Sequence, residues 1–348
     1  QSNANNTHGV SIRGVHLLHV QGCKVSSCIL SWVGIGVWLY ESSNNIVEDC
    51  FCDGYTYFTR SGVTLELSSN NNIHNNTLYG SEQAGIEVFG SDGNLIIQNI
   101  IMSKWAGINS EYSDSNTIAG NSITAVRWGV WLRSRSSHNL VENNSITNSR
   151  TGIQVNYGSS YNLVKANTVT GGEYCGIEVH DDSSNNRVTA NNITGNMYGI
   201  EVKSATNNTL SYNNITGCSK IGALFTNASR NLIQRNNFLQ NAQQAYSNGS
   251  SNIWDADGAG NYWDDYNTTS NNGIGDNPYV IDQANLDHYP LTRINNDTLP
   301  LAAESTSPTP QPQDSSSVVT PAVLVILFSA LAGTAIALGF KKRRGRAV

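Results

Sequence analysis

The residues best suited to chemistry stand together in the stretch "EVHDD", residues 178–182. In an extended strand Glu178 and His180 point to the same side, and Asp181 follows in a turn. Glu201 occupies the same place in a second copy of the word "GIEV". Two neighbouring carboxylates can raise the pKa of one carboxyl group and act as acid and base on a sugar chain. These four residues are the catalytic candidates, although polar turns commonly contain Asp-Asp without any activity.

A repeated unit must position these side chains. "GIEV" occurs three times, and each copy lies within a longer repeat that opens on a glycine. These glycines recur every 22 to 26 residues, at Gly36, Gly62, Gly85, Gly107, Gly129, Gly152, Gly176, Gly199 and Gly222. A sustained period of this size is typical of a solenoid, and the Gly-apolar-x-apolar pattern favours short strands over helices. We therefore expect an all-β, parallel β-helix solenoid of about ten turns.

Two columns of asparagine follow the same period. The first is Asn94, Asn116, Asn139, Asn162, Asn186, Asn208 and Asn231. The second is Asn99, Asn121, Asn144, Asn167, Asn192, Asn214 and Asn237, which fall at or near one position. Asparagine tolerates turn dihedrals, and stacked side-chain amides can pass hydrogen bonds along a rod. Both columns are therefore predicted to be part of the scaffold.

The outward face of the glycine-opened strands is the predicted binding surface. Counting from each glycine, positions +1 and +3 are apolar and should face the core, so positions +2 and +4 face out. The candidates for binding a polysaccharide or surface glycan are Trp38, Glu87, Trp131, Gln154, Glu178 and Glu201. Aromatic rings can stack on sugars while carboxylates and amides bond hydroxyls. Trp131 is expected to stack on a sugar ring and to be replaceable with little loss of stability. The alternative is a solvated face with scattered aromatic residues.

Four of the six cysteines crowd near the start of the chain. Cys28 precedes Cys50 by 22 residues and Cys52 by 24, about one turn in either case, so a disulfide between turns is sterically plausible. A Cys/His metal site with the nearby histidines is the alternative, but these spacings match no standard zinc pattern. Cys175 and Cys218 are expected to be buried thiols.

A second possible metal site lies in residues 252–291. Its aspartates, among glycine and asparagine, are Asp255, Asp257, Asp264, Asp265 and Asp276. Oxygen ligands at this density suit calcium, and "NNGIGD" is similar to a calcium loop with too few carboxylates. The alternative is a segment that caps the open end of the last turn with Trp254, Tyr262 and Trp263. Calcium is the only cofactor that the sequence suggests.

Charge and composition restrict the possible partners. The formal net charge is −6, and removing the five basic residues of 341–346 leaves −11 for the rest of the chain. Such a surface should repel nucleic acid, so no nucleic-acid partner is expected. Sequons such as those at Asn75 and Asn143 suit an exported glycoprotein, although an asparagine column beside threonine creates them by composition alone.

The chain divides into five predicted segments. The repeats span 1–245, a capping segment 246–299 and a Pro/Ser-rich linker 300–317. An uncharged run at 318–340 is long enough for a transmembrane helix, and the basic tail 341–348 should lie in the cytoplasm. The ectodomain would then stand outside the cell. The sequence begins "QSNANNTHGV", with neither an initiator methionine nor the apolar stretch of an export signal. We therefore expect a mature or truncated N-terminus.

The repeats resemble those of the NosD-like family, and the resemblance covers residues 9 to about 290. Segments similar to "GNYW", "GIGD" and "YPL" within 252–291 close many archaeal surface proteins of this family. The resemblance implies a right-handed, pectin-lyase-like β-helix. Its members are often labelled copper-binding, but two methionines and seven scattered histidines give that label little support here.

Taken together, these features predict a membrane-anchored surface protein that binds polysaccharide or serves as a structural element. A polysaccharide lyase, hydrolase or epimerase is the alternative from another class. A NosD-like metal-handling accessory protein is a third.

Overall fold

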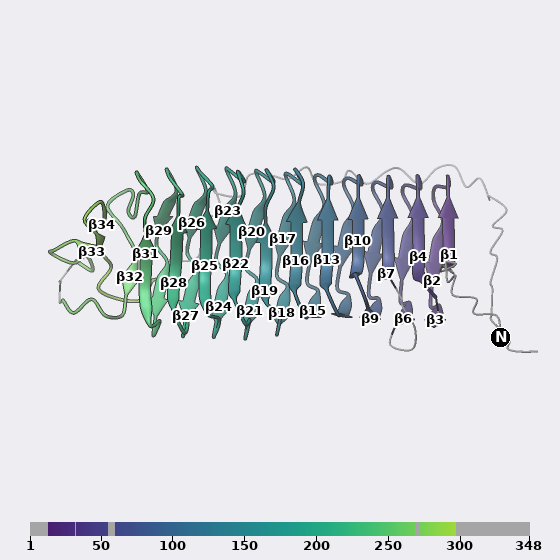
Figure 1. Cartoon of the computed structure of the whole chain (residues 1–348), viewed down its shortest axis with the longest axis horizontal. Helices are drawn as coiled ribbons and strands as arrows, with labels where there is room; N and C mark the ends of the chain where they lie inside the picture. Colours follow the sequence, from purple (N-terminus) through teal and green to yellow (C-terminus); the bar gives the residue numbers. More distant parts are fainter. Residues whose placement is uncertain (1–12, 32, 55–59, 269, 271, 297–348) are drawn as a thin grey trace, which may run out of the picture.

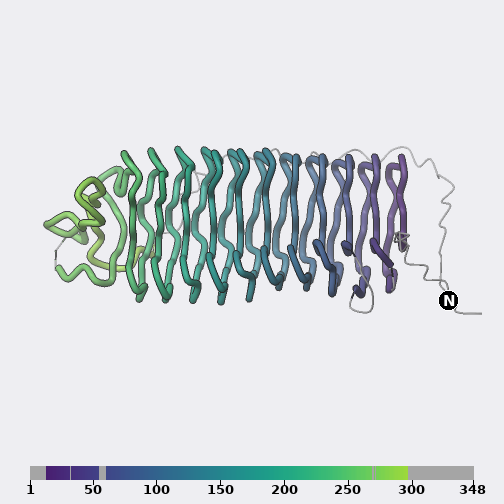
Figure 2. The backbone as a smooth tube through the Cα atoms, in the orientation of Figure 1, coloured from purple at the N-terminus to yellow at the C-terminus, as the bar shows by residue number. Residues whose placement is uncertain are grey.

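The described residues form one rod of stacked turns. The computed structural model describes residues 13–31, 33–54, 60–268, 270 and 272–296, and within them the chain is a right-handed parallel β-solenoid of about eleven turns. Figure 1 shows the turns side by side along the rod, and the tube in Figure 2 shows the same path repeated from turn to turn. The predicted all-β solenoid is confirmed, with about one turn more than expected.

Three parallel sheets run along the rod. The first sheet holds the strands that follow the repeat glycines: β1 (Arg13–Leu18), β4 (Ile35–Tyr40), β7 (Ser61–Glu66), β10 (Ala84–Phe89), β13 (Ala106–Glu111), β16 (Trp128–Arg133), β19 (Thr151–Val155), β22 (Cys175–His180), β25 (Tyr198–Lys203), β28 (Ile221–Thr226) and β31 (Gln243–Ser247). The second sheet is β2 (Lys24–Ser26), β5 (Ile46–Glu48), β8 (Asn72–His74), β11 (Leu95–Ile97), β14 (Thr117–Ala119), β17 (Leu140–Glu142), β20 (Leu163–Lys165), β23 (Arg187–Thr189), β26 (Thr209–Ser211) and β29 (Leu232–Gln234). The third sheet is β3 (Ile29–Ser31), β6 (Phe51–Asp53), β9 (Thr77–Ser81), β12 (Ile100–Ser103), β15 (Ser122–Ala125), β18 (Ser145–Thr147), β21 (Thr168–Thr170), β24 (Asn192–Thr194), β27 (Asn214–Thr216), β30 (Asn237–Leu239) and β32 (Tyr262–Trp263).

The repeat glycine is required because its turn leaves no room for a side chain. A Cβ on Gly107 would lie 2.3 Å from Cγ2 of Ile123 and 2.5 Å from the carbonyl oxygen of Gly129. The glycine and the residue after it, Ile108, therefore both lie against the core. Inward and outward residues therefore do not alternate strictly along the strand at this point. The residue before the glycine lies on the outer face, on the same side as the residue two positions after the glycine.

Two asparagine ladders hold the turns in register. In the first, the Oδ1 of each asparagine accepts from the backbone N–H of the asparagine one turn earlier, and usually from its Nδ2 as well. Asn162 Oδ1 accepts from both groups of Asn139, at 2.9 and 3.1 Å. This ladder agrees with the predicted column. The second ladder runs through the predicted Asn99, Asn121, Asn144 and Asn167 and continues through Asn191, Asn213 and Asn236. The predicted Asn192, Asn214 and Asn237 were therefore placed one residue too late.

The left-handed turn position belongs to the residue before each ladder asparagine. Ser115, His138 and Tyr161 have φ near 58° and precede Asn116, Asn139 and Asn162. A serine ladder was not predicted. In this ladder the backbone N–H of each serine donates to the Oγ of the serine one turn later. Its members are Ser42, Ser68, Ser91, Ser113, Ser136, Ser159 and Ser183.

The chain after β31 packs against the C-terminal end of the solenoid. Trp263 is buried, stacking on Phe238 at 4.4 Å and on Tyr279 at 4.2 Å between ring centroids. The antiparallel pair β33 (Tyr279–Asp282) and β34 (Asn285–Asp287) follows. Asp287 accepts hydrogen bonds from the backbone N–H of Asn261, the last member of the second ladder, at 2.7 Å and from Nε1 of Trp263 at 2.9 Å. Burial raises the pKa of Asp287 to about 6, while these N–H donors oppose the rise.

The predicted linker 300–317, transmembrane helix 318–340 and tail 341–348 lie outside the described residues. Within the part of the chain that the structure describes, there is no helix of the length and hydrophobicity needed to cross a bilayer.

Candidate functional site

The outer face of the first sheet carries the candidate site. On each strand, the residue before the glycine and the residue two after it face outward together. Register pairing aligns them from turn to turn, as in Thr151 with Cys175 and Gln154 with Glu178. Each strand thus contributes three outward residues: the residue before the glycine, position +2, and position +4 near the end of the strand.

A groove of about 620 Å³ crosses four neighbouring strands of this face, β7, β10, β13 and β16. With strands about 4.8 Å apart, it runs roughly 14 Å along the rod. Position +2 supplies Thr64, Glu87 and Asn109, and position +4 supplies Glu66, Phe89, Glu111 and Arg133. The turns before the strands supply the remaining lining residues, Arg60, Glu82, Gln83 and Trp105.

The polar groups of the groove are held by one another. Arg60 donates to Oε1 of Gln83 at 2.8 Å and lies 3.5 Å from the carboxylate of Glu87. Arg133 lies 2.7 Å from the carboxylate of Glu111 and donates from Nε to Asn109 at 3.1 Å. These pairs fix the orientation of donors and acceptors, as a polar recognition site requires.

One groove residue has no such partner. The hydroxyl of Thr64 is buried and, within the described residues, has no hydrogen-bond partner. Leaving a buried hydroxyl unsatisfied costs roughly 1 to 3 kcal/mol.

Three tryptophans form a cluster at the C-terminal end of the groove. Trp128 and Trp131 stack on each other at 4.0 Å, and Trp105 meets both at nearly perpendicular angles. Arg127 lies 4.6 Å from the ring of Trp128, and Arg133 lies 4.3 Å from that of Trp131. Trp131 is only 6% exposed, and Trp105 is the partly exposed member of the cluster.

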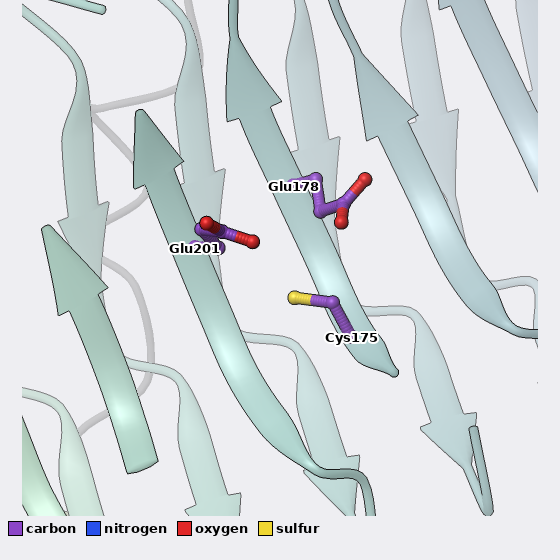
Figure 3. Close-up of side chains that lie close together, drawn as sticks. All are labelled: Cys175, Glu178 and Glu201. Atoms are coloured by element: carbon purple, nitrogen blue, oxygen red, sulfur yellow. The ribbon is translucent and has the colours of Figure 1, made fainter. Parts of the chain in front are cut away.

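Farther along the rod, the "EVHDD" strand and its neighbour form an acidic cluster, shown in Figure 3. Cys175, Glu178 and Glu201 place one ligand atom each within 4.8 Å of one another, and all three are buried. The sulfur of Cys175 and the carboxylate of Glu201 point into the space between β22 and β25. Burial, assisted by the charge of Glu178, raises the pKa of Glu201, although a 2.9 Å hydrogen bond from the hydroxyl of Tyr174 opposes the rise. Two carboxylates and a thiol are thus held close together away from solvent.

His180 is held at the edge of this cluster. Its Nε2 lies 2.9 Å from Nε2 of Gln154 and 3.5 Å from the carboxylate of Glu178, and its Nδ1 lies 3.0 Å from Asp181. Burial would lower the pKa of His180, but Glu178 and Asp181 raise it overall. The four predicted catalytic residues are therefore brought together. Gln154 also donates to Glu178, so the cluster is closed by its own partners.

The predicted glycan-binding residues divide between these places. Glu87 lines the groove. Glu178, Glu201 and Gln154 belong to the buried cluster, and Trp38 lies near the N-terminal end of the rod with His16 stacked on it at 4.6 Å.

Trp131 differs from the expectation. It lies on the outer face as predicted, but its ring packs between Trp128 and Arg133, and its Nε1 donates to Asn156 at 3.0 Å. A sugar cannot stack on a ring that is covered in this way. Trp105 is the partly exposed tryptophan of the cluster.

The five aspartates proposed for calcium do not converge. Asp255 accepts from His288 at 2.8 Å, Asp264 accepts from the backbone N–H of Gln240 at 2.5 Å, and Asp265 accepts from the hydroxyl of Tyr279 at 3.1 Å. Asp257 occupies a left-handed turn position, and Asp276 lies on the exposed surface. In the described part of the chain, the one cluster of three potential ligands is Cys175, Glu178 and Glu201. Calcium binding stays a prediction.

The cysteine register favours one of the two predicted disulfides. Ile29 pairs with Phe51 and Leu30 with Cys52, so Cys28 faces Cys50 on the next turn. All six cysteines are free thiols in the structure, and burial raises the pKa of Cys50 to about 11, although a hydrogen bond with the backbone of Cys28 opposes the rise. A bridge therefore stays a prediction for Cys28 and Cys50 alone. Cys175 and Cys218 are buried, as expected.

Sequence reasoning missed the groove residues that precede the strands. Arg60, Gln83 and Trp105 all stand two residues before a repeat glycine. Arg127, Arg150 and Tyr174 continue that column. This run of large polar and aromatic residues at one repeat position is the signal in the sequence that marks them.

Similar solved structures are polysaccharide-modifying β-helix enzymes. A double mutant of the periplasmic alginate epimerase AlgG superposes with a TM-score of 0.58 at 15% identity, over 66% of this chain and 64% of that one. The A-module of the Azotobacter vinelandii mannuronan C-5 epimerase AlgE6 has a TM-score of 0.52 at 15% identity, over 69% of this chain and 89% of that one. The chain thus spans less than two thirds of the AlgG epimerase. At these identities the likeness shows the fold. Among curated proteins, none matches the sequence significantly.

A family model described as periplasmic copper-binding protein (NosD) matches residues 1–164 and 135–268. The clustered donors do not fit copper, because Cu(I) prefers several thiolate, thioether or imidazole ligands. Here one thiol, whose pKa burial raises well above its usual value, meets two hard carboxylates. The family match itself spans more than half of the sequence, and the stacked repeats agree with it. The chain therefore belongs to the NosD family.

Proposed function

We propose that the protein binds polysaccharide in the groove on the outer face of the first sheet. The observation that carries the proposal is the groove itself, where the partly exposed Trp105 stands with Glu87 and the exposed Gln83 in the lining. An aromatic ring with convergent donors and acceptors is what sugar recognition requires. The groove follows the rod, so an extended chain can lie along it. Polysaccharide enzymes among the similar structures support this ligand class.

Binding should depend strongly on Trp105. Replacing it with Ala removes a large apolar contact and should weaken polysaccharide binding by about 1 to 3 kcal/mol, or roughly 5- to 150-fold. Affinity gel electrophoresis of the purified protein against a panel of neutral and uronic polysaccharides first identifies the ligand, and titration calorimetry then measures the change.

Tyr161→Ala is the matched control. Tyr161 is 58% exposed and stacks on His138 near the second sheet, away from the groove. It should leave binding unchanged. If the wild-type protein binds no member of the panel, the proposed function is wrong, and if both variants bind as the wild type does, the groove is not the site.

The acidic cluster favours hydrolysis or another sugar-cleaving reaction as a second candidate. Glu178 and Glu201 lie within the separation of the carboxyl pairs in retaining glycosidases, about 5 Å. The raised pKa of Glu201 would suit it to protonate the leaving oxygen, with Glu178 as the second carboxylate. Tyr174 and Gln154 would first have to release the two side chains.

This candidate predicts a separation of turnover from binding. Glu201→Gln and Glu178→Gln should each reduce release of reducing ends by roughly 100- to 10,000-fold, the usual contribution of acid-base catalysis, and leave affinity for the polysaccharide nearly unchanged. Glu142→Gln, on β17 of the second sheet, is the control. Absence of turnover by the wild-type protein on every polysaccharide that it binds would leave a binding protein only.

We further propose that the described solenoid is the outer part of a surface protein. The family to which it belongs is described as periplasmic, which agrees with an exported domain. In this proposal the segment with Trp254 and Trp263 caps the last turn, and residues 318–340 anchor the chain. Protease treatment of intact cells should release the solenoid if that anchor exists.

A further inference from the structure

The charges of the groove bear on which polysaccharide it can accept. Both arginines that line it are already paired with carboxylates, Arg60 with Glu87 and Arg133 with Glu111. Each also donates to an amide oxygen, Gln83 for Arg60 and Asn109 for Arg133. A uronate is recognised best by a guanidinium that can donate two parallel hydrogen bonds to its carboxylate. In both arginines Nε and Nη2 are already engaged, so a uronate would have to compete with Glu87 or Glu111 for a guanidinium that is already paired.

The lining has an excess of negative charge. Four carboxylates, those of Glu66, Glu82, Glu87 and Glu111, face two guanidinium groups. Lys104 at the rim pairs with Glu82, and Glu66 forms no ion pair among the described residues. A polyanionic chain would therefore meet one uncompensated carboxylate, that of Glu66, and basic groups that are already paired, which opposes its binding.

The uncharged groups point to hydroxyls as the ligand groups. Gln83 offers an exposed side-chain amide and Trp105 a partly exposed aromatic ring. The paired carboxylates of Glu87 and Glu111 retain acceptor positions, because a carboxylate has about four lone-pair sites. All of these can bond or contact sugar hydroxyls and ring carbons without a charged partner.

We propose that the groove selects a neutral polysaccharide and excludes polyuronates. This inference rests on the proposed function and narrows it. It separates the protein from the alginate epimerases that share its fold, because alginate is a polyuronate.

The test compares neutral and uronic chains on the full-length protein. Affinity gel electrophoresis with β-glucan, xylan, alginate and polygalacturonate, each at about 50 and 500 mM salt, measures both affinity and screening. We expect at least one neutral polysaccharide to bind roughly 10-fold or more tightly than either uronate, with little dependence on salt. Alginate or polygalacturonate binding equally well and weakening with salt would overturn the inference while the proposed function stands. No binding of any of the four polysaccharides would overturn both the inference and the proposed function.

A charge variant connects the selectivity to the groove. Glu66→Gln removes the unpaired carboxylate and should strengthen uronate binding by roughly 3- to 10-fold, with less than about a 2-fold change for the neutral ligand. Glu142→Gln removes a carboxylate that pairs with Lys165 at 3.3 Å outside the groove, and it should change neither affinity. Equal effects of the two variants would mean that the selectivity comes from net charge and not from the groove.

Discussion

Replacing Trp131 with Ala is expected to lower the free energy of unfolding by roughly 3 to 5 kcal/mol, as removal of a buried tryptophan does in a protein core. The ring is covered by Trp128 on one side and by Arg133 on the other, and its Nε1 donates to Asn156. Its removal would leave a cavity beside Trp128, an acceptor without its donor and a guanidinium without its platform. Urea unfolding followed by tryptophan fluorescence and circular dichroism measures the change.

Trp105→Ala is the control for this experiment. Trp105 belongs to the same cluster but is partly exposed and lines the groove. Compared with Trp131→Ala, Trp105→Ala should lower the free energy of unfolding by clearly less and weaken polysaccharide binding by more. The reverse order, with Trp131→Ala stable and defective in binding, would restore the expectation drawn from the sequence and contradict the packing described above.

The two tryptophans show where the sequence stops being informative. The glycine period and the apolar positions +1 and +3 specify the core, because every turn must bury the same columns. They place Trp131 on the outer face correctly. Whether an outward ring is open to solvent depends on how its neighbours pack. Here Trp128 and Arg133 of the same strand cover the ring, and Asn156 of the next turn accepts from its Nε1. The pattern of positions +1 to +4 leaves out the residue before the glycine and gives no side-chain packing.

The acidic cluster illustrates a second limit. Glu178 and Glu201 were expected to be neighbours because both occupy position +2, and the register pairs them directly. Cys175 was expected to be buried but not to join them. It does so because the glycine and the residue after it both face the core, which returns the residue before the glycine to the outer face. A break in alternation cannot be seen in a sequence that simply repeats Gly-apolar-x-apolar.

The second asparagine ladder was displaced for a related reason. From Asn191 onward the chain carries pairs of asparagines, Asn191 with Asn192 and Asn213 with Asn214, and either member can satisfy a period of about 23. The inward amides are Asn191 and Asn213, and Asn192 and Asn214 are exposed at the start of their strands. Only the hydrogen bonds between turns distinguish the members of each pair.

Replacing Asn162 with Ala in the first ladder is expected to destabilise the protein by about 2 to 4 kcal/mol. Its Oδ1 accepts from both the backbone N–H and Nδ2 of Asn139, and its Nδ2 donates to the carbonyl oxygen of Ser136 at 3.0 Å and to Asn186 at 3.1 Å. Without it, the buried N–H of Asn139 loses its acceptor, which alone costs roughly 1 to 3 kcal/mol. The remaining loss comes from the bonds that Asn162 donated.

Asn192→Ala is the matched control, because it is the asparagine that the sequence pattern places in a ladder and the structure places outside one. Its side chain is exposed at the start of β24, so the substitution should stay within about 0.5 kcal/mol of the wild type. Equal losses for the two variants would mean that the ladder amides contribute no more than any surface asparagine.

Hydrogen exchange can then test how far the effect of Asn162→Ala travels. Each turn of a solenoid contacts only its neighbours, so its stability depends on its own contacts and on the two interfaces beside it. Protection should fall first in the turns that hold Asn139 and Asn186, which bond directly to Asn162, and should remain near β4 and β31. Uniform loss of protection from end to end would show instead that the rod unfolds as a single unit, and that the ladder couples all of its turns.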